Sequence, residues 1–195
     1  MAEVAFNCCI SLTSVDLSRT KLTTLPRKAF AACAALETLY IPGTVTSIAN
    51  ECFGDTAINK VNTTTEKLTK LYFGGSLEAW EAIGILNTTA NTRLLNGGCT
   101  VYCADGGVWN AAYTSADNLC YNLSNGILTI RCNGDMVDYS VDGAPWYSVA
   151  DEVITVIFED GITAIGANAF RGCVNMTNVQ ICEEITMVGE NAFAD

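Results

Sequence analysis

The feature that most constrains this chain is an apolar pattern that recurs at places far apart in the sequence. Residues 30–53 and residues 170–193 both begin with Phe, have Cys three positions later, and reach the next Phe after twenty-three positions. Between the two Phe residues, apolar residues occupy the offsets six, nine, eleven, fifteen and eighteen, which in the first copy are Leu36, Leu39, Ile41, Val45 and Ile48. Two further copies end at Phe170 and at Phe30. Such repeats predict a solenoid, because one coil cannot bury its own apolar edge and neighbouring coils must stack on it.

The spacing inside each repeat predicts its local structure. Leu39 and Ile41 are two residues apart, so they share one face of a strand. We expect strands at residues 12–17, 36–41, 68–73, 153–158 and 176–181, each parallel to its repeat neighbour. Val45 and Ile48 are three apart, which favours a tight helical or 3₁₀ turn. The A-F-x-x-C segment then returns the chain to the start of the next coil.

The repeat resembles the BspA-type leucine-rich repeats of bacterial and some protist surface proteins. Their pattern, close to A-F-x-x-C-x-x-L-x-x-I-x-I-P-x-x-V-x-x-I-G, is similar to AFAACAALETLYIPGTVTSIA here and to GITAIGANAFRGC. Residues 71–83 resemble the segment that closes an array in such proteins, and residues 118–149 resemble the β-rich segment that opens one. The resemblance implies a β-dominated α/β fold: a leucine-rich-repeat solenoid with a parallel sheet, interrupted by a segment that contains a β-hairpin.

The hairpin is expected at residues 118–133. Asn125-Gly126 is a two-residue turn signal between alternating runs, and it pairs Leu123 with Leu128 and Tyr121 with Ile130. Residues 86–117, rich in Asn, Thr and Gly, are expected to be irregular. We therefore divide the chain into residues 1–112, which hold repeats and the array-closing segment, and residues 113–195, which hold the hairpin segment and further repeats.

Composition excludes several kinds of partner. The net charge is −11, with 10 Lys plus Arg against 21 Asp plus Glu, which argues against nucleic acid and anionic membranes. No apolar run is long enough to insert into a membrane. No signal peptide is present, so the protein is either cytosolic or a piece of a longer secreted chain. Both ends fall inside a repeat, which favours a fragment of a longer extracellular or cell-surface chain. The alternative is a protomer that covers its open solenoid ends by self-association.

The sequence lacks the residues that the common catalytic and zinc sites require. The chain has no His, so Ser-His and Cys-His pairs and His-containing zinc sites cannot form, and no C-x-x-C pair exists. We expect no enzymatic activity, no cofactor and no metal. The carboxylates that could suggest glycosidase or calcium chemistry are interpreted as solvated turns; they are Asp135, Asp138, Asp142, Asp151, Glu152, Glu159 and Asp160.

The ten cysteines are expected to be mostly structural. Cys9, Cys33 and Cys173 occupy one repeat position, which suits a small buried apolar residue. Cys99 and Cys103 are the pair expected to be bonded. The hairpin register places Cys120 and Cys132 on opposite sides of the sheet, so these two are not expected to pair.

The best candidate for a binding surface is the outward face of the predicted parallel sheet. The outward positions form two columns, Ser14, Thr38, Lys70, Thr155 and Asn178 in one, and Asp16, Tyr40, Tyr72, Ile157 and Gln180 in the other. Tyrosine on a rigid sheet suits recognition, although these residues are also ordinary strand formers. The candidate ligand-binding residues are Asp16, Thr38, Tyr40, Lys70, Tyr72, Ile157 and Gln180.

The resemblance implies a non-catalytic adhesion module of a cell-surface or secreted protein. Its partner would be a protein ligand, such as a surface protein of a host or a neighbouring cell. The alternative is a structural spacer that projects another domain and has no ligand of its own.

Overall fold

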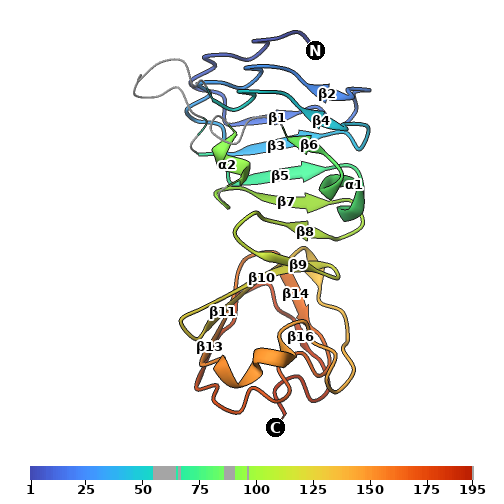
Figure 1. Cartoon of the computed structure of the whole chain (residues 1–195), viewed down its shortest axis with the longest axis vertical. Helices are drawn as coiled ribbons and strands as arrows, with labels where there is room; N and C mark the ends of the chain where they lie inside the picture. The colour runs from blue at the N-terminus through green and yellow to red at the C-terminus, as the bar shows by residue number, and fades with distance from the viewer. Residues whose placement is uncertain (55–64, 66, 86–90, 96, 195) are drawn as a thin grey trace. The chain divides into compact units, whose positions relative to one another are not determined.

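The computed structural model describes residues 1–54, 65, 67–85, 91–95 and 97–194. The chain divides into two compact units (Figure 1). Unit 1 comprises Met1–Asp105 and Trp109–Ala112, and unit 2 comprises Gly106–Val108 and Tyr113–Asp195. Each unit is described below by itself.

Unit 1 is a solenoid whose coils form two sheets (Figure 1). The first sheet has the order β1 (Ser14–Asp16), β3 (Thr38–Ile41), β5 (Lys70–Phe73), β7 (Thr100–Cys103) and β8 (Val108–Trp109). The second has the order β2 (Thr24–Leu25), β4 (Ser47–Ile48) and β6 (Gly84–Ile85). Two short helices, α1 (Leu77–Glu81) and α2 (Thr92–Leu95), lie between strands of this unit.

Unit 2 begins with antiparallel strands and continues as a solenoid. Its larger sheet has the order β15 (Asn178–Gln180), β13 (Thr155–Phe158), β11 (Ile127–Cys132), β10 (Leu119–Ser124) and β9 (Thr114–Ala116). The smaller sheet has the order β12 (Gly134–Asp135), β14 (Ile162–Ile165) and β16 (Met187–Val188). A 3₁₀ segment, η1 (Tyr147–Glu152), precedes β13.

The predicted strand pairing is confirmed. Strand β1 pairs with β3, and β13 with β15, both in parallel. The hairpin is also confirmed, because β10 and β11 pair with Leu123 opposite Leu128 and Tyr121 opposite Ile130. Asn125 and Gly126 have φ values of 51° and 78°, the left-handed conformations that a tight two-residue hairpin turn needs. Strand β11 then pairs in parallel with β13, so the hairpin supplies the first strand against which the repeats stack.

Two expectations about local structure are wrong. The apolar pairs three residues apart, such as Val45 and Ile48, do not form helical turns; they lead into or lie in the short strands β2, β4 and β14. These strands are parallel to their counterparts in the next coil, and the cross-coil backbone hydrogen bonds favour an extended chain over a helical turn. Residues 86–117 are also not simply irregular, because they contain α2, β7, β8 and β9.

The A-F-x-x-C segments form the remaining side of each coil and have an unusual backbone. The residue two positions before each of five repeat Phe residues has a positive φ; these residues are Val4, Lys28, Glu51, Asn168 and Asn191. Two residues after the Phe, Cys8, Ala32 and Gly172 are also left-handed. In this turn the amides of alternate residues donate to the next coil, as Phe6 does to Ala29 O at 2.9 Å and Cys8 to Ala31 O at 2.9 Å. The paired left-handed residues thus let one coil bond to the next without a regular strand.

Aromatic side chains lie in the core of each unit. In unit 1, Phe30 stacks between Phe6 and Phe53, with ring centroids 5.3 and 5.8 Å apart. In unit 2, Phe170 stacks between Trp146 and Phe193 at 5.3 and 5.2 Å. Trp80 and Trp146 are both 1% exposed, so each is a core residue of its unit.

All ten cysteines are free thiols, so the expected Cys99–Cys103 bond is wrong. Cys103 ends strand β7 and Cys99 immediately precedes it, and four residues of extended chain separate their Cα atoms by about 13 Å, beyond the reach of a disulfide. Cys33 and Cys173 are buried as predicted, but Cys9 is only half-buried, because no coil of this chain covers the outer side of the first repeat. Cys120 lies opposite Arg131 and Cys132 opposite Leu119, the predicted register.

Candidate interaction surface

The outward face of the sheet β1-β3-β5-β7 brings together the candidate residues of unit 1. In each strand the central apolar residue is buried and its neighbours point outward, as for Val15 between Ser14 and Asp16. The register aligns Asp16, Tyr40 and Tyr72 in one column. It adds Tyr102 of β7, which sequence reasoning missed. We call Tyr40, Tyr72 and Tyr102 the tyrosine ladder.

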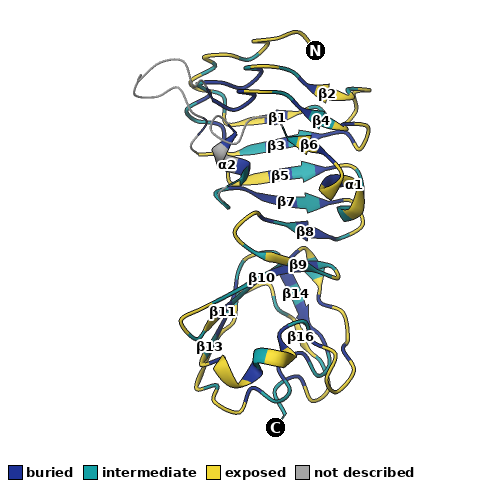
Figure 2. Cartoon of the chain, viewed as in Figure 1, coloured by how far each residue is buried: buried dark blue, intermediate teal, exposed yellow. Residues whose placement is uncertain are grey.

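The rings of the tyrosine ladder are stacked on one another. The centroids of Tyr40 and Tyr72 are 4.6 Å apart with ring planes 10° from parallel, and those of Tyr72 and Tyr102 are 5.3 Å apart at 24°. All three residues are partly exposed, and Figure 2 shows intermediate burial along β3, β5 and β7. Since each ring covers a face of its neighbour, the ladder presents mainly ring edges and phenolic ends outward.

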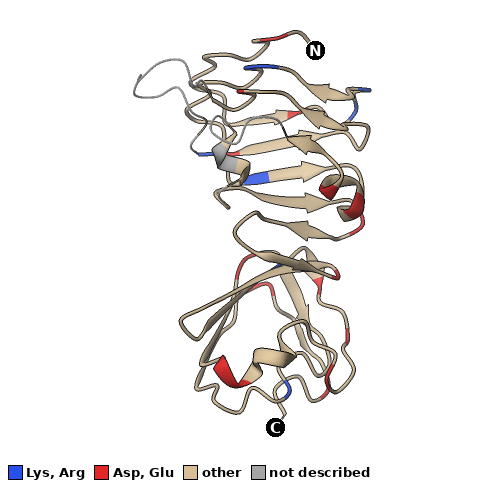
Figure 3. Ribbon diagram, viewed as in Figure 1, with Lys and Arg blue, Asp and Glu red and all other residues tan. Residues whose placement is uncertain are grey.

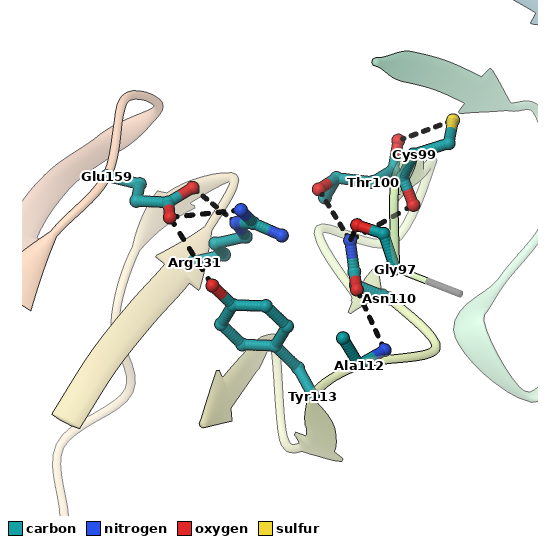
Figure 4. Close-up of polar contacts among 8 residues, drawn as sticks. All are labelled: Gly97, Cys99, Thr100, Asn110, Ala112, Tyr113, Arg131 and Glu159. Carbon is teal, nitrogen blue, oxygen red and sulfur yellow. Dashed lines mark hydrogen bonds and ion pairs between the residues drawn. The ribbon is translucent and has the colours of Figure 1, made fainter. Parts of the chain in front are cut away.

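The neighbouring column is polar and ends in a buried contact. It consists of Ser14, Thr38, Lys70 and Thr100, aligned by the same register. Ser14 and Lys70 are exposed, Thr38 is partly exposed, and Thr100 is buried. The Asn110 amide nitrogen fixes Thr100 by donating to its Oγ1 at 3.1 Å and to Cys99 O at 3.0 Å (Figure 4). The accessible part of this column is therefore formed by β1, β3 and β5.

Charges on this face are sparse and of both signs (Figure 3). Asp16 is fully exposed, and hydrogen bonds from the Ser18 side chain and from Ser18 N, the latter at 2.9 Å from Asp16 Oδ1, lower the pKa of its carboxyl group. Asp16 is therefore anionic at neutral pH, and Lys70 supplies a positive charge two strands away. The face combines an aromatic strip with one charge of each sign.

The remaining candidates, Ile157 and Gln180, lie on the larger sheet of unit 2. They are direct neighbours in the register of β13 and β15, and Thr129 of β11 lies on the other side of Ile157. Ile157 is partly exposed and Gln180 is exposed. The structure thus places these two residues together within unit 2, on a different sheet from the tyrosine ladder.

Another part of that sheet is occupied by contacts within the chain (Figure 4). Arg131 donates to both carboxylate oxygens of Glu159, and its guanidinium carbon lies 4.2 Å from the ring centroid of Tyr113. The Tyr113 hydroxyl donates to Glu159 Oε1 at 3.4 Å. Cys120, opposite Arg131, is buried, and loss of hydration raises the pKa of its thiol to about 12. Arg131, Glu159 and Tyr113 satisfy one another's hydrogen-bonding groups, so this cluster is structural. The spacing of these residues in the sequence does not predict it.

The acidic residues and thiols form no cluster suited to a metal ion within the described parts of the chain. Three of the carboxylates interpreted as solvated turns have specific contacts. Glu159 accepts from Arg131 and Tyr113 as described above, Asp135 accepts from Thr163 Oγ1 at 2.6 Å, and Asp138 accepts from Ala167 N at 2.7 Å. Burial raises the pKa of the Cys33 and Cys173 thiols to about 11, so neither is a thiolate at neutral pH. Among the described residues, no helix is both long and apolar enough to span a bilayer.

The repeats match a family model. The model for the BspA type Leucine rich repeat region matches six copies, at residues 1–77 and 146–195. The chain belongs to the BspA-type leucine-rich-repeat family. The coils, the parallel sheets and the A-F-x-x-C turns described above are the physical form of that repeat. A search of the curated proteins found no match.

Solved structures of leucine-rich-repeat proteins are similar over part of their length. A leucine-rich repeat protein from Eubacterium ventriosum is 38% identical, over 43% of this chain and 23% of its own, with a TM-score of 0.40. A leucine rich cell surface protein from Faecalibacterium prausnitzii is 19% identical, over 97% of this chain and 53% of its own, with a TM-score of 0.27. This BspA-type chain therefore spans about a quarter and about half of these two proteins.

Proposed function

We propose that this chain is a non-catalytic protein-binding module that uses the outward face of the sheet β1-β3-β5-β7. The observation that carries the proposal is the stacked tyrosine ladder. Its three rings are held in one register by backbone pairing, so little side-chain freedom is lost when a partner binds.

The geometry of the ladder favours a protein partner over a carbohydrate. A sugar ring binds by lying flat on the face of an aromatic side chain, but the inner faces of this stack are covered by the neighbouring rings. Ring edges and hydroxyl groups instead suit the mixed apolar and hydrogen-bonding contacts of a protein interface. Asp16 and Lys70 border the ladder and would orient such a partner through charge.

The absence of histidine supports a non-catalytic role, as does membership of a repeat family whose general role is interaction or scaffolding. We further propose that the parent protein is secreted or attached to a cell surface and that the module mediates adhesion to a protein of a host or neighbouring cell. The resemblance of the repeats to those of surface proteins supports this location. Ile157 and Gln180 are a second, smaller candidate contact on unit 2.

The proposal is tested with beads that carry the 195-residue chain and are applied to host or bacterial cells. Removal of cell-surface proteins with trypsin should abolish bead binding, whereas removal of glycans with glycosidases should not. The double variant Tyr40→Ser/Tyr72→Ser should bind at least about tenfold more weakly, as expected for central tyrosines of an interface.

Tyr147→Ser is the matched control, because Tyr147 is an exposed tyrosine, 43% accessible, on η1 of unit 2. Thermal melting checks that each variant folds. If the double variant binds as well as the Tyr147→Ser control, the ladder is not the binding face. If no cell type is bound in a protein-dependent way, the chain acts as a spacer.

A further inference from the structure

Unit 1 contains a cavity of about 300 Å³ beside α1, distinct from the outward sheet face. Its lining residues come from α1, β6, α2 and β8 and the segment between α1 and β6; they are Trp80, Glu81, Ile83, Ile85, Leu95 and Trp109. Its volume is at the lower end of the range for small-molecule sites, which suits a compact chemical group and not an extended ligand.

Two tryptophans form an aromatic corner in the wall of this cavity. The ring centroids of Trp80 and Trp109 are 5.7 Å apart and their planes meet at 61°. Trp80 is buried and packs on its other side against Phe73, at 5.5 Å and 61°. Trp109 is partly exposed. The corner is therefore preformed, with one indole fixed in the core and the other accessible from solvent.

The polar side chain of the cavity is a carboxylate. Glu81 is exposed, and within the described residues it has no salt-bridge partner. Asp105, which follows β7, contacts the first residue of the same helix, where its Oδ2 accepts a hydrogen bond from Leu77 N at 3.1 Å. Burial raises the pKa of the nearby Cys103 thiol to about 12, and the charges of Asp105 and Glu81 add to this effect. Glu81 thus supplies a negative charge in the wall that also contains the two indoles.

We propose that this cavity binds a small organic cation, an alkylammonium or trimethylammonium group. The faces of indole rings attract cations, and paired aromatic walls are the usual way in which proteins hold ammonium groups. Glu81 would neutralise the charge, and the side chains of Ile83, Ile85 and Leu95 would contact the methyl or methylene groups. A neutral apolar ligand would desolvate Glu81 without compensation, and an anion would be repelled by it. The site goes beyond the proposed function, because it shares no residue with the tyrosine ladder.

The test is an NMR titration of the indole N–H signals of the three tryptophans with choline. The signals of Trp80 and Trp109 should shift saturably, with a dissociation constant on the order of millimolar for a small exposed cation site. The signal of Trp146 should not move, because its indole nitrogen is buried in unit 2 and donates to Ala169 O at 2.8 Å. The uncharged isostere 3,3-dimethyl-1-butanol should bind at least about fivefold more weakly.

Variants separate the carboxylate from general effects of charge. Glu81→Gln should weaken choline binding about fivefold, whereas Glu78→Gln, an exposed residue of the same helix that does not line the cavity, should leave it unchanged. Trp109→Leu should abolish the shift of Trp80, and dispersed indole signals verify that each variant folds. A parallel titration with N-acetyl-lysine amide, which carries a primary ammonium group, distinguishes a protein side chain from a free trimethylammonium compound as the source of the cation. Equal binding of the neutral isostere, equal effects of the two glutamate variants, or no saturable shift would overturn the proposal.

Discussion

The left-handed backbone of the A-F-x-x-C turns can be tested by exchanging alanine and glycine at one repeat position in two coils. The two exchanges should change stability in opposite directions. Ala32 and Gly172 occupy the same repeat position, two residues after Phe30 and Phe170, with φ values of 57° and 80°. Ala32→Gly should stabilise unit 1, and Gly172→Ala should destabilise unit 2. The sign depends only on which residue tolerates the shared backbone conformation.

The magnitudes follow from two opposing terms. Holding alanine in the left-handed conformation destabilises the folded state by about 1–2 kcal/mol. Replacing alanine by glycine lowers the free energy of unfolding by about 0.4–1 kcal/mol, because the unfolded chain then has more conformational freedom. Ala32→Gly should therefore raise the free energy of unfolding by about 0.5–1 kcal/mol. A Cβ atom on Gly172 would lie 3.4 Å from Tyr147 Cε2, an ordinary van der Waals distance, so Gly172→Ala should lose a similar amount without a clash.

Calorimetry measures the change in melting temperature, about 2–6 °C in each direction, and hydrogen exchange assigns it to one unit. Ala34→Gly is the control, because Ala34 lies two residues after Ala32, just past the A-F-x-x-C segment, and does not have a positive φ. This variant should lose about 0.4–1 kcal/mol. If Ala32→Gly lowers the melting temperature as much as Ala34→Gly does, the left-handed backbone is not a significant cost and the reasoning fails.

Other measurable consequences concern packing, thiols, catalysis and association. Phe30→Ala removes the central ring of its stack and should cost about 3–5 kcal/mol in denaturant unfolding; a loss below 1 kcal/mol would contradict the packing described. Buried Cys33 and Cys173 should react slowly with a thiol reagent at pH 8, whereas exposed Cys8 should react quickly. Because burial raises the pKa of the Cys33 and Cys173 thiols to about 11, the melting temperature should fall as pH rises from about 9 to about 11. A melting temperature that stays constant over this pH range would argue against this. Hydrolase screens, with and without divalent metal, should show no turnover above a heat-denatured control. Apolar side chains such as Val174 and Met187 are 63% and 59% exposed, so light scattering of the 195-residue chain should increase with association at high concentration, and a strict monomer would refute this.

The positions of the tyrosine ladder could be predicted only in part. Tyr40 follows Leu39 in a complete repeat, and Tyr72 follows Leu71 in a recognisable strand, so their outward direction follows from alternation. Tyr102 was missed because β7 has the sequence TVYC, without the usual leucines, and lies in a segment rich in Gly and Asn. Its place beside Tyr72 is set by pairing between strands separated by α1 and α2, which no local pattern reveals.

The second sheet and the left-handed turns were missed for related physical reasons. A pair of apolar residues three apart fits both a helical turn and a bent extended segment, and bonds to the next coil decide between them. At the turns, Asn168, Asn191 and Gly172 are residues that tolerate positive φ, but Lys28 and Ala32 are not. In those coils the stacking of neighbours imposes the conformation against local preference.

Stacking also decides what the tyrosine ladder can recognise. Each ring contributes its faces to its neighbours, so the intact ladder has few free ring faces along its length. Replacing Tyr72 alone by Ser would leave a gap of one strand and expose the inner faces of Tyr40 and Tyr102 to solvent. The same face would then offer flat aromatic platforms suited to sugars or planar ligands. Continuity of the ladder across β3, β5 and β7, more than the number of tyrosines, is therefore what favours a protein partner for this surface.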